Sequence, residues 1–345
     1  MDTSNRKLKI LAKVVEEYIR TGEPIGSKAI AQSFDTPISS ATIRNDMAAL
    51  EKMGLLEQPH TSAGRVPSYL GYRLYIEQLM DREILTQGEM DEIDQMVENS
   101  GHTPDEVVDN CAKLLALKTG CTIVSASNLP QYTVISKVEV IPTGRRLYAL
   151  LMVTTGGTVK NKVCRVEFDI THEQLEFFAQ VMNENLSGLK IDSLTDEMLD
   201  KLAVAMGSYV MALSPLLNGV RELSYQLSHS SVNIEQESKL LSSGDFDTKE
   251  IANFLASKNE LGQIMAQALD GINVVFGQES DSFAITNSSM VLAKYNCGEN
   301  TAGAFGVIGP LRLNYAKIIP YIEYFSDSVT RLLSQADEYD DEDLI

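Results

Sequence analysis

The fold of this chain is decided by residues 38–67, which read ISSATIRNDMAALEKMGLLEQPHTSAGRVP. Ser39 or Ser40 can accept a hydrogen bond from a free amide at a helix N-terminus, so we expect one of them to cap a helix over residues 39–53. One face of this helix is apolar at the spacing of a buried stripe, with Ile43, Met47 and Leu50. Its opposite, early-turn face carries side chains that can reach base edges in a major groove, namely Ser39, Ser40, Thr42, Arg44 and Asn45.

A polar hairpin is expected directly after this helix. Gly54 ends the helix, residues 55–56 begin a strand, and a second strand resumes at Val66. The tip between the strands offers donors suited to phosphates or to the narrow groove of DNA, namely His60, Thr61, Ser62 and Arg65. Gly64 is the tip residue that we expect to need a positive φ. A plain hairpin loop with no binding role is the alternative.

Two further helices are predicted before the stretch. Apolar residues recur at helical spacing over residues 8–19, and Gly22 is placed to end that helix. Ser27 is expected to cap a short second helix. Three helices and a wing make a winged helix-turn-helix, which we interpret as a DNA-binding domain over residues 1–78. An ordinary solvated face, or a protein-docking module, remains the alternative, and the salt dependence of binding separates the two functions.

The charge of the chain is unevenly distributed. The 345 residues carry a net charge of −19. Residues 1–75 hold ten Lys and Arg against eight Asp and Glu, a net charge of +2, which leaves −21 for the remainder. A nearly neutral head on an acidic body suits a DNA-binding module whose other domains are kept away from phosphates.

The rest of the chain predicts an α+β multidomain protein. Residues 79–103 are acidic and polar, and we expect a linker or a loosely packed helix there. Helices and strand-like runs over 104–171 and 271–333 predict an antiparallel sheet domain. The mostly helical sequence of 172–270 interrupts it. The acidic residues 334–345 are expected to be disordered.

The sequence lacks a recognisable catalytic, cofactor or metal motif. Gly303, Gly306 and Gly309 are followed by Pro310 and not by a helix start, so we interpret them as turn glycines and not as a phosphate loop. The four histidines are far apart and have no cysteine or carboxylate at ligand spacing. We therefore expect no enzyme activity, no cofactor and no metal.

The compartment is inferred from the cysteines and from hydropathy. The four cysteines are scattered and are expected to be buried thiols in a reducing cytoplasm. The N-terminus lacks the apolar region of a signal peptide, and no run approaches the ~18 apolar residues of a membrane span. We expect a cytoplasmic protein without a membrane partner.

Four stretches of the sequence carry a family resemblance. They are ATIRNDM at 41–47, LL at 55–56, PHTSAGRVP at 59–67 and GYR at 71–73. Together they closely resemble the bacterial heat-inducible transcription repressors of the HrcA family, and the wing stretch 59–67 is the most specific of them. The resemblance continues to about residue 333 through features such as GVIGP at 306–310.

The resemblance implies more than residue spacing can. It implies that the sheet domain is GAF-like, that 172–270 holds an inserted dimerisation domain, and that the protein is a homodimer on double-stranded DNA. The operator would be a CIRCE-type inverted repeat upstream of chaperone operons, with half-sites roughly 10–21 bp apart. Heat would relieve repression, and the GroEL chaperonin would support the repressor. A ligand-gated regulator with its effector site in the GAF-like domain is the alternative.

Overall fold

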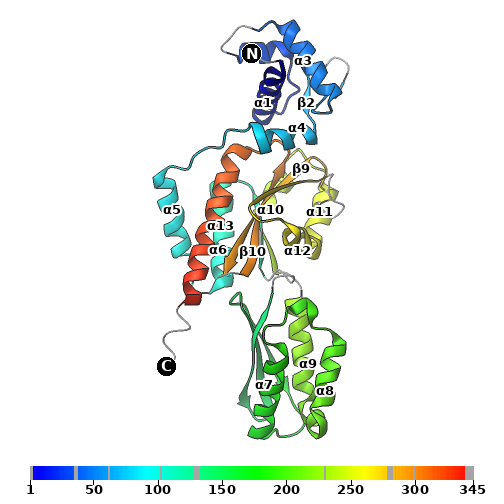
Figure 1. Cartoon of the computed structure of the whole chain (residues 1–345), viewed down its shortest axis with the longest axis vertical. Helices are drawn as coiled ribbons and strands as arrows, with labels where there is room; N and C mark the ends of the chain where they lie inside the picture. Colours follow the sequence, from blue (N-terminus) through cyan, green and yellow to red (C-terminus); the bar gives the residue numbers. More distant parts are fainter. Residues whose placement is uncertain are drawn as a thin grey trace.

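The chain forms three units along one long axis. The computed structural model describes residues 3–34, 38–60, 63–101, 103–127, 133–228, 231–277, 283, 285–297 and 300–338. The winged helix lies at one end, a sheet domain lies in the middle, and a second unit of sheet and helices lies at the other end (Figure 1). This architecture confirms the predicted α+β multidomain fold with an N-terminal winged helix.

The winged helix has the predicted order of elements. They are α1 (Thr3–Thr21), α2 (Ser27–Gln32), α3 (Ser40–Lys52), β1 (Leu56–Glu57) and β2 (Val66–Pro67). Gly22 follows α1 with a φ of 70°, as expected of a glycine that ends a helix. The predicted cap of α2 is wrong, because Gly26 holds the cap position and Ser27 is already the first helical residue.

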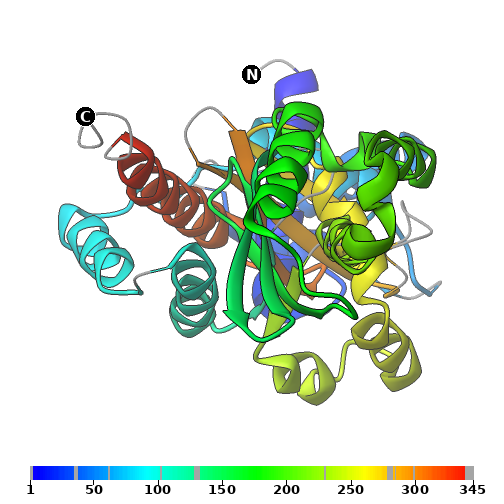
Figure 2. The same ribbon diagram turned by 90° about the horizontal axis from the view of Figure 1, so that it is seen from below.

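The segment after the wing is more ordered than a linker. Helix α4 (Tyr69–Leu74) continues into a π-helical turn, η1 (Tyr75–Leu79). The linker predicted over 79–103 contains helix α5 (Gln87–Glu98), which packs against the last helix, α13 (Tyr315–Glu338). The end view shows α5, α13 and α6 together on one side of the molecule (Figure 2).

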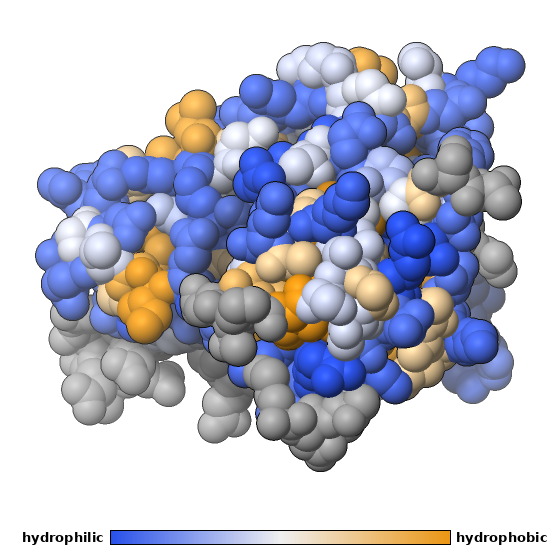
Figure 3. All heavy atoms as spheres, turned by 90° about the horizontal axis from the view of Figure 1, so that it is seen from above, coloured by the Kyte–Doolittle hydropathy of each residue, from blue (hydrophilic) through white to orange (hydrophobic). Residues whose placement is uncertain are grey.

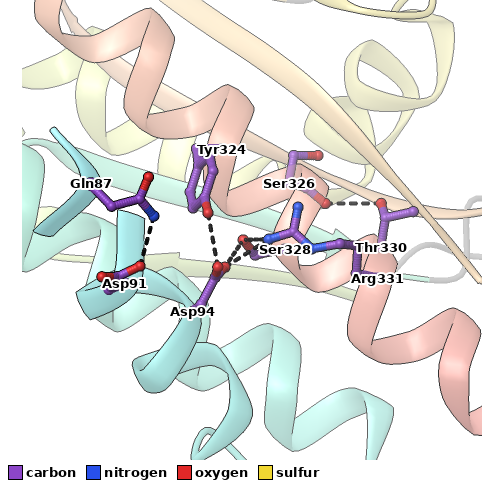
Figure 4. A network of polar contacts seen from close by, with 8 residues as sticks. All are labelled: Gln87, Asp91, Asp94, Tyr324, Ser326, Ser328, Thr330 and Arg331. Atoms are coloured by element: carbon purple, nitrogen blue, oxygen red, sulfur yellow. Dashed lines mark hydrogen bonds and ion pairs between the residues drawn. The ribbon is translucent and has the colours of Figure 1, made fainter. Parts of the chain in front are cut away.

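A polar network fastens α5 to α13. The Asp94 carboxylate accepts hydrogen bonds from Tyr324 Oη at 2.8 Å, Ser328 Oγ at 2.6 Å and Arg331 Nη2 at 2.7 Å (Figure 4). Burial opposes ionisation of Asp94, but the hydrogen bonds and the Arg331 charge outweigh it and lower the Asp94 pKa. Ile93 is fully buried beside this network. Of the two alternatives expected for 79–103, the helix agrees with α5 and the linker does not, but the expected loose packing is wrong because α5 is fastened to α13.

The middle domain is built on one antiparallel sheet with the strand order β7-β3-β10-β9-β8. Its strands are β3 (Thr122–Ser127), β7 (Ser231–Glu235), β8 (Ile272–Phe276), β9 (Ser288–Cys297) and β10 (Asn300–Pro310). One face is covered by α13 and by α6 (Pro104–Thr119). The other face is covered by α10 (Glu237–Ser242), α11 (Thr248–Ala256) and α12 (Lys258–Gln267) (Figure 1).

The third unit has its own sheet and core. The sheet has the order β4-β5-β6, with β4 (Ile135–Gly144), β5 (Leu147–Thr154) and β6 (Val159–Arg165). Its helices are α7 (His172–Leu186), α8 (Asp196–Ala205) and α9 (Val210–Leu227), joined by the short turns η2 (Ile191–Ser193) and η3 (Gly207–Tyr209). Helices α7 and α9 lie against the sheet and close a core separate from that of the middle domain.

The predicted domain limits are wrong in two places. Strands β4 to β6, expected in the middle domain as part of 104–171, form the separate sheet. Strand β7 and helices α10 to α12, expected in the insert as part of 172–270, belong to the middle domain. Burial explains the difference, because β5 buries alternate residues whereas β3 is buried at five consecutive positions. Alternation is typical of a sheet covered on one face, and continuous burial of one covered on both.

Two smaller expectations are also corrected. The three glycines interpreted as turn residues lie inside strand β10. A Cβ atom on Gly303 would come within 2.0 Å of Tyr295 Oη, so close packing explains the glycine there. In the tail predicted to be disordered, residues 334–338 are helical and 339–345 lie outside the described residues.

Within the described residues, no individual helix has both the length and the apolar character of a membrane span. The bent pair Asp196–Ala205 and Gly207–Leu227, at an angle of 106°, meets both criteria when taken together. The four cysteines form no disulfide with one another; Cys111, Cys164 and Cys297 are buried and Cys121 is partly exposed.

Candidate nucleic-acid interface

Helix α3 begins with a side-chain cap, as the sequence predicted. Ser39 Oγ accepts a hydrogen bond from the Thr42 amide at 3.1 Å and lies 2.8 Å from Thr42 Oγ1. The apolar stripe of Ile43, Met47 and Leu50 is buried under the helix. The Ser39 and Thr42 hydroxyls therefore bond to each other and to the helix start, which leaves them less available to a ligand than the sequence suggested.

A buried acid fixes α3 against α1, and sequence reasoning missed it. Asp46 is only 6 % exposed. Its Oδ2 accepts from Arg6 Nε at 2.7 Å and its Oδ1 from Arg6 Nη2 at 3.3 Å. This hydrogen bonding raises the Arg6 pKa. A two-point contact of this kind sets the orientation of the helix as well as its position.

The outer face of α3 presents its long polar side chains to solvent. Arg44 and Asn45 are exposed, and within the described residues neither has a hydrogen-bond or ion-pair partner. Ser40 is half-buried at the start of the same helix. Lys28, on the neighbouring α2, is exposed as well and was not predicted. Arg44 and Asn45 are therefore the long, exposed side chains on this face that have no partner among the residues the structure describes.

The wing is held by a third strand contact that the sequence did not reveal. Beyond the register of β1 and β2, the Ile25 and Arg65 backbones exchange two hydrogen bonds of 2.9 Å each. Gly64 lies at this crossing, and a Cβ atom there would sit 2.4 Å from the Ile25 carbonyl. The expected positive φ at Gly64 is wrong, because it has none, and the close backbone approach explains the glycine instead.

The charged wing residue is already paired. Arg65 donates from Nε at 3.0 Å and lies with Nη2 at 2.9 Å from Glu51 Oε2, in the last turns of α3. His60 is exposed at the tip. Thr61 and Ser62, predicted to contact DNA, lie outside the described residues. Arg65 thus links the wing to the helix and is not a free donor.

The structure brings the helix and the wing together around one groove of about 480 Å³. Its polar and small residues come from α2, α3 and the hairpin, and include Ser27, Arg44, Gln58, Ala63, Gly64 and Arg65. Gln58 Nε2 donates to the Ala63 carbonyl at 3.2 Å across the hairpin. Ser27 was missed because its neighbours in this groove are remote in sequence, whereas Gln58 lies in the predicted hairpin just before the tip residues that were singled out. Seen from this end, the molecule is mostly hydrophilic, with small separate apolar groups (Figure 3).

Two family models match the chain. The model described as winged helix-turn-helix transcription repressor, HrcA DNA-binding, matches residues 2–79. The model described as HrcA protein C terminal domain matches residues 105–319. Together they cover the winged helix, the third unit and the middle domain as far as the start of α13. The first model assigns DNA binding to the unit that carries the groove.

Similar proteins of full length carry the same description. The heat-inducible transcription repressor HrcA of Acetivibrio thermocellus is 31% identical, over 95% of this chain and 96% of that protein. The protein of the same name from Thermoanaerobacter sp. is 32% identical, over 99% and 100%. A crystal structure of a hypothetical protein at 2.2 Å resolution aligns with a TM-score of 0.57 and 23% identity, covering 96% of this chain and 98% of that one, which shows the fold alone.

These relatives point to a regulator rather than an enzyme. Two family models and long alignments at about 30% identity agree with the winged helix described above. The chain belongs to the HrcA family of heat-inducible transcription repressors.

Proposed function

We propose that the chain represses transcription by inserting α3 into the major groove of an operator. The observation that carries this proposal is the exposed pair Arg44 and Asn45, which have no protein partner within the described residues. Arginine can bind guanine and asparagine adenine through two hydrogen bonds each, so an uncommitted pair on one helix face suits base reading. Ser39, Ser40 and Thr42 start the same helix and are proposed to contact the backbone.

The wing is proposed to follow the adjacent phosphates or minor groove. His60 is exposed on it, and Thr61 and Ser62 are the tip residues assigned to this contact from the sequence. Gly64 lets the wing approach the α1–α2 turn, and Arg65 holds the wing against α3 through Glu51. The groove between helix and wing would thus receive the sugar-phosphate backbone.

A second copy of the chain is proposed to pack on the open face of the β4-β5-β6 sheet. The register places Ala149 opposite Val163 and Val153 opposite Val159, so these side chains share the face away from α7 and α9. Val163 is 60 % exposed, and that face carries an apolar group of Ile141, Leu147, Ala149, Leu151, Val153, Val159 and Val163. An exposed apolar face of this kind on a small sheet is typical of a protein interface.

A symmetric dimer requires a symmetric operator. We expect an inverted repeat of CIRCE type upstream of chaperone operons, with half-sites roughly 10–21 bp apart. Repression would be relieved by heat, in the cytoplasm, and the GroEL chaperonin would help the chain to reach its active form. Family membership supports these assignments.

Operator binding and pairing are tested together. We expect purified protein to be dimeric by light scattering and to footprint an inverted repeat in chaperone promoters of its own genome, more strongly with chaperonin present. Affinity should fall steeply with salt, as phosphate contacts require. A strictly monomeric protein that ignores the repeat would overturn the proposal.

A matched pair of variants locates the interface. Val163→Glu places a charge on the open sheet face and should give monomers that no longer bind the full inverted repeat. Val204→Glu, at a position 81 % exposed on α8 and away from that face, should change neither property. Equal behaviour of the two variants would exclude the sheet face.

A further inference from the structure

Strand β8 forms one edge of the middle sheet. It lies at the end of the strand order and, among the residues that the structure describes, pairs with β9 alone. The Gly277 amide donates to the Ser288 carbonyl at 3.0 Å. Because hydrogen-bonded positions alternate along an antiparallel strand, residues 273 and 275 of β8 also direct their main-chain groups toward β9. The main-chain groups of Ile272 and Val274 therefore point away from the sheet. Within the described residues, no hydrogen bond occupies those outward groups.

On the opposite edge of the same sheet, a side chain occupies one of the outward main-chain groups. On β7, Asn233 Oδ1 accepts from the Ile234 amide at 2.9 Å, which is an outward group of that strand. Asn233 Nδ2 in turn donates to Asp109 at 3.3 Å and to Glu235 at 3.2 Å. Proteins commonly block edge strands in such ways, because an unpaired edge accepts foreign strands. On β8, by contrast, no side chain within the described residues bonds to the main-chain groups of Ile272 and Val274.

A groove of about 420 Å³ runs beside β8, between the winged helix and the middle domain. Its apolar walls come from η1, β8 and α13, through Ile76, Val274, Phe276 and Ile319. Leu269 stands at its margin with 73 % of its surface exposed. The groove therefore combines an apolar lining with a row of free main-chain groups.

Two guanidinium groups lie along this groove. Arg73 stacks over the Phe276 ring at 5.6 Å, and Arg82 lies 3.3 Å from Glu323 on α13. Glu77 lies 3.7 Å from Arg73, so each of the two guanidinium groups already has a carboxylate partner. A guanidinium group has five N–H donors, so it can bind a second carboxylate as well. Helix α5, fastened to α13 by the network of Figure 4, holds the segment that carries Arg82 in place.

We propose that the β8 edge binds an extended segment of another protein as an added strand. Free donors and acceptors at Ile272 and Val274 repeat at the two-residue period of a strand. Alternate side chains of the bound segment would face the groove, with an apolar residue against Ile76 and Ile319 and carboxylates toward Arg73 and Arg82. The partner is therefore an acidic and apolar peptide segment, and its binding would fix the junction between the DNA-binding head and the middle domain.

The test uses the full chain and defined peptides. A labelled probe, acetyl-Glu-Thr-Val-Thr-Glu-amide, should bind at micromolar to sub-millimolar concentration by fluorescence anisotropy. The matching probe with lysine in place of both glutamates should bind at least ten-fold more weakly. Of two N-methylated probes, one blocked at the third amide and one at the second and fourth, only one should bind, because a strand offers one edge to its neighbour.

Hydrogen exchange locates the contact without any substitution. The Ile272 and Val274 amides should exchange rapidly in the free protein and slow at least ten-fold with the acidic probe. Val274→Pro removes one outward donor and should abolish binding, whereas Val232→Pro, the matched outward position on β7, should not. Failure of the acidic probe to bind at millimolar concentration, equal binding of the lysine probe, or unchanged exchange at Ile272 and Val274 would overturn the proposal. None of these measurements involves DNA, so they stand apart from operator binding.

Discussion

The ion pair between Glu51 and Arg65 allows the role of Arg65 in the wing to be tested, because two possible roles predict opposite changes in DNA affinity for the same substitution. Arg65 is 19 % exposed at its side chain, and its guanidinium makes two contacts of 2.9 and 3.0 Å with Glu51 Oε2. We expect Arg65 to act as a strut that holds the wing against α3. If it were instead a phosphate ligand, Glu51 would compete with DNA for it.

Glu51→Gln separates these roles. Removing the Glu51 charge should by itself favour DNA binding, because the acid repels phosphates. If Arg65 is a phosphate ligand, its release from Glu51 should increase the affinity further. A strut predicts the opposite, because the wing loses a partly buried, charge-assisted contact worth about 1 kcal/mol, or roughly five-fold in affinity. Arg65→Ala should then cost a similar amount, and the double variant little more than either single one.

The assay is anisotropy of a labelled operator duplex over about 0.05 to 0.2 M salt. If Arg65 only holds the wing against α3, Arg65→Ala should leave the slope of log affinity against log salt unchanged. If Arg65 binds a phosphate, the substitution should reduce the magnitude of this slope by about 0.9. Tighter binding by Glu51→Gln, together with a reduced slope in Arg65→Ala, would refute the strut. Urea unfolding of each variant controls for loss of the fold.

Four further predictions concern single residues. Arg44→Ala should weaken operator binding by about 1–3 kcal/mol and relax base preference at one position, with an unchanged melting temperature, as measured by binding to a set of single-base operator variants. Gly64→Ala should displace the wing, because the new Cβ meets the neighbouring backbone at 2.4 Å, and amide chemical shifts of the hairpin would report it. Tyr72 is fully buried and its hydroxyl has no hydrogen-bond partner within the described residues, so Tyr72→Phe should raise the free energy of unfolding in urea by about 1 kcal/mol. The hydrogen bond from Tyr321 holds the Glu89 pKa at about 2, below its ordinary 4.5, so the contribution of Glu89 to stability is complete above about pH 4.5 and is lost as the pH falls toward 2. Acid unfolding followed by hydrogen exchange in α5 should show this loss, and Glu89→Gln should remove the pH dependence.

Part of the local structure of the DNA-binding head was predictable from the sequence, although the cap of α2 and the φ of Gly64 were predicted wrongly. The cap at Ser39, the buried stripe of α3 and the glycine after α1 are short-range effects, and the structure confirms each. The pairs Arg6–Asp46 and Arg65–Glu51 were not predictable, because they join residues 40 and 14 positions apart in sequence. Such pairs depend on how helices pack, which periodicity does not reveal.

The division of strands between two sheets was not predictable from apolar patterns. Strand β5 reads LYALLMVT, an almost continuous apolar run, yet it buries alternate residues, whereas β3 reads TIVSAS and is buried at five consecutive positions. The unpaired edge of β8 and the purpose of Gly64 were not predictable either, because both depend on which backbone lies alongside. Contact of main chain with main chain leaves little trace in side-chain composition.

The placement of the third unit (β4 to α9) has a consequence for the order of folding. Strand β3 is synthesised before this unit, and its sheet neighbours β7 and β10 are synthesised only after it. The winged helix and the third unit are each continuous in sequence, so they can fold early. Strand β3 meanwhile remains unpaired, with apolar residues on both of its faces. Recovery of active protein after synthesis or heat should therefore be limited by the late closure of one discontinuous sheet, and the already folded DNA-binding head would be the least demanding part to restore.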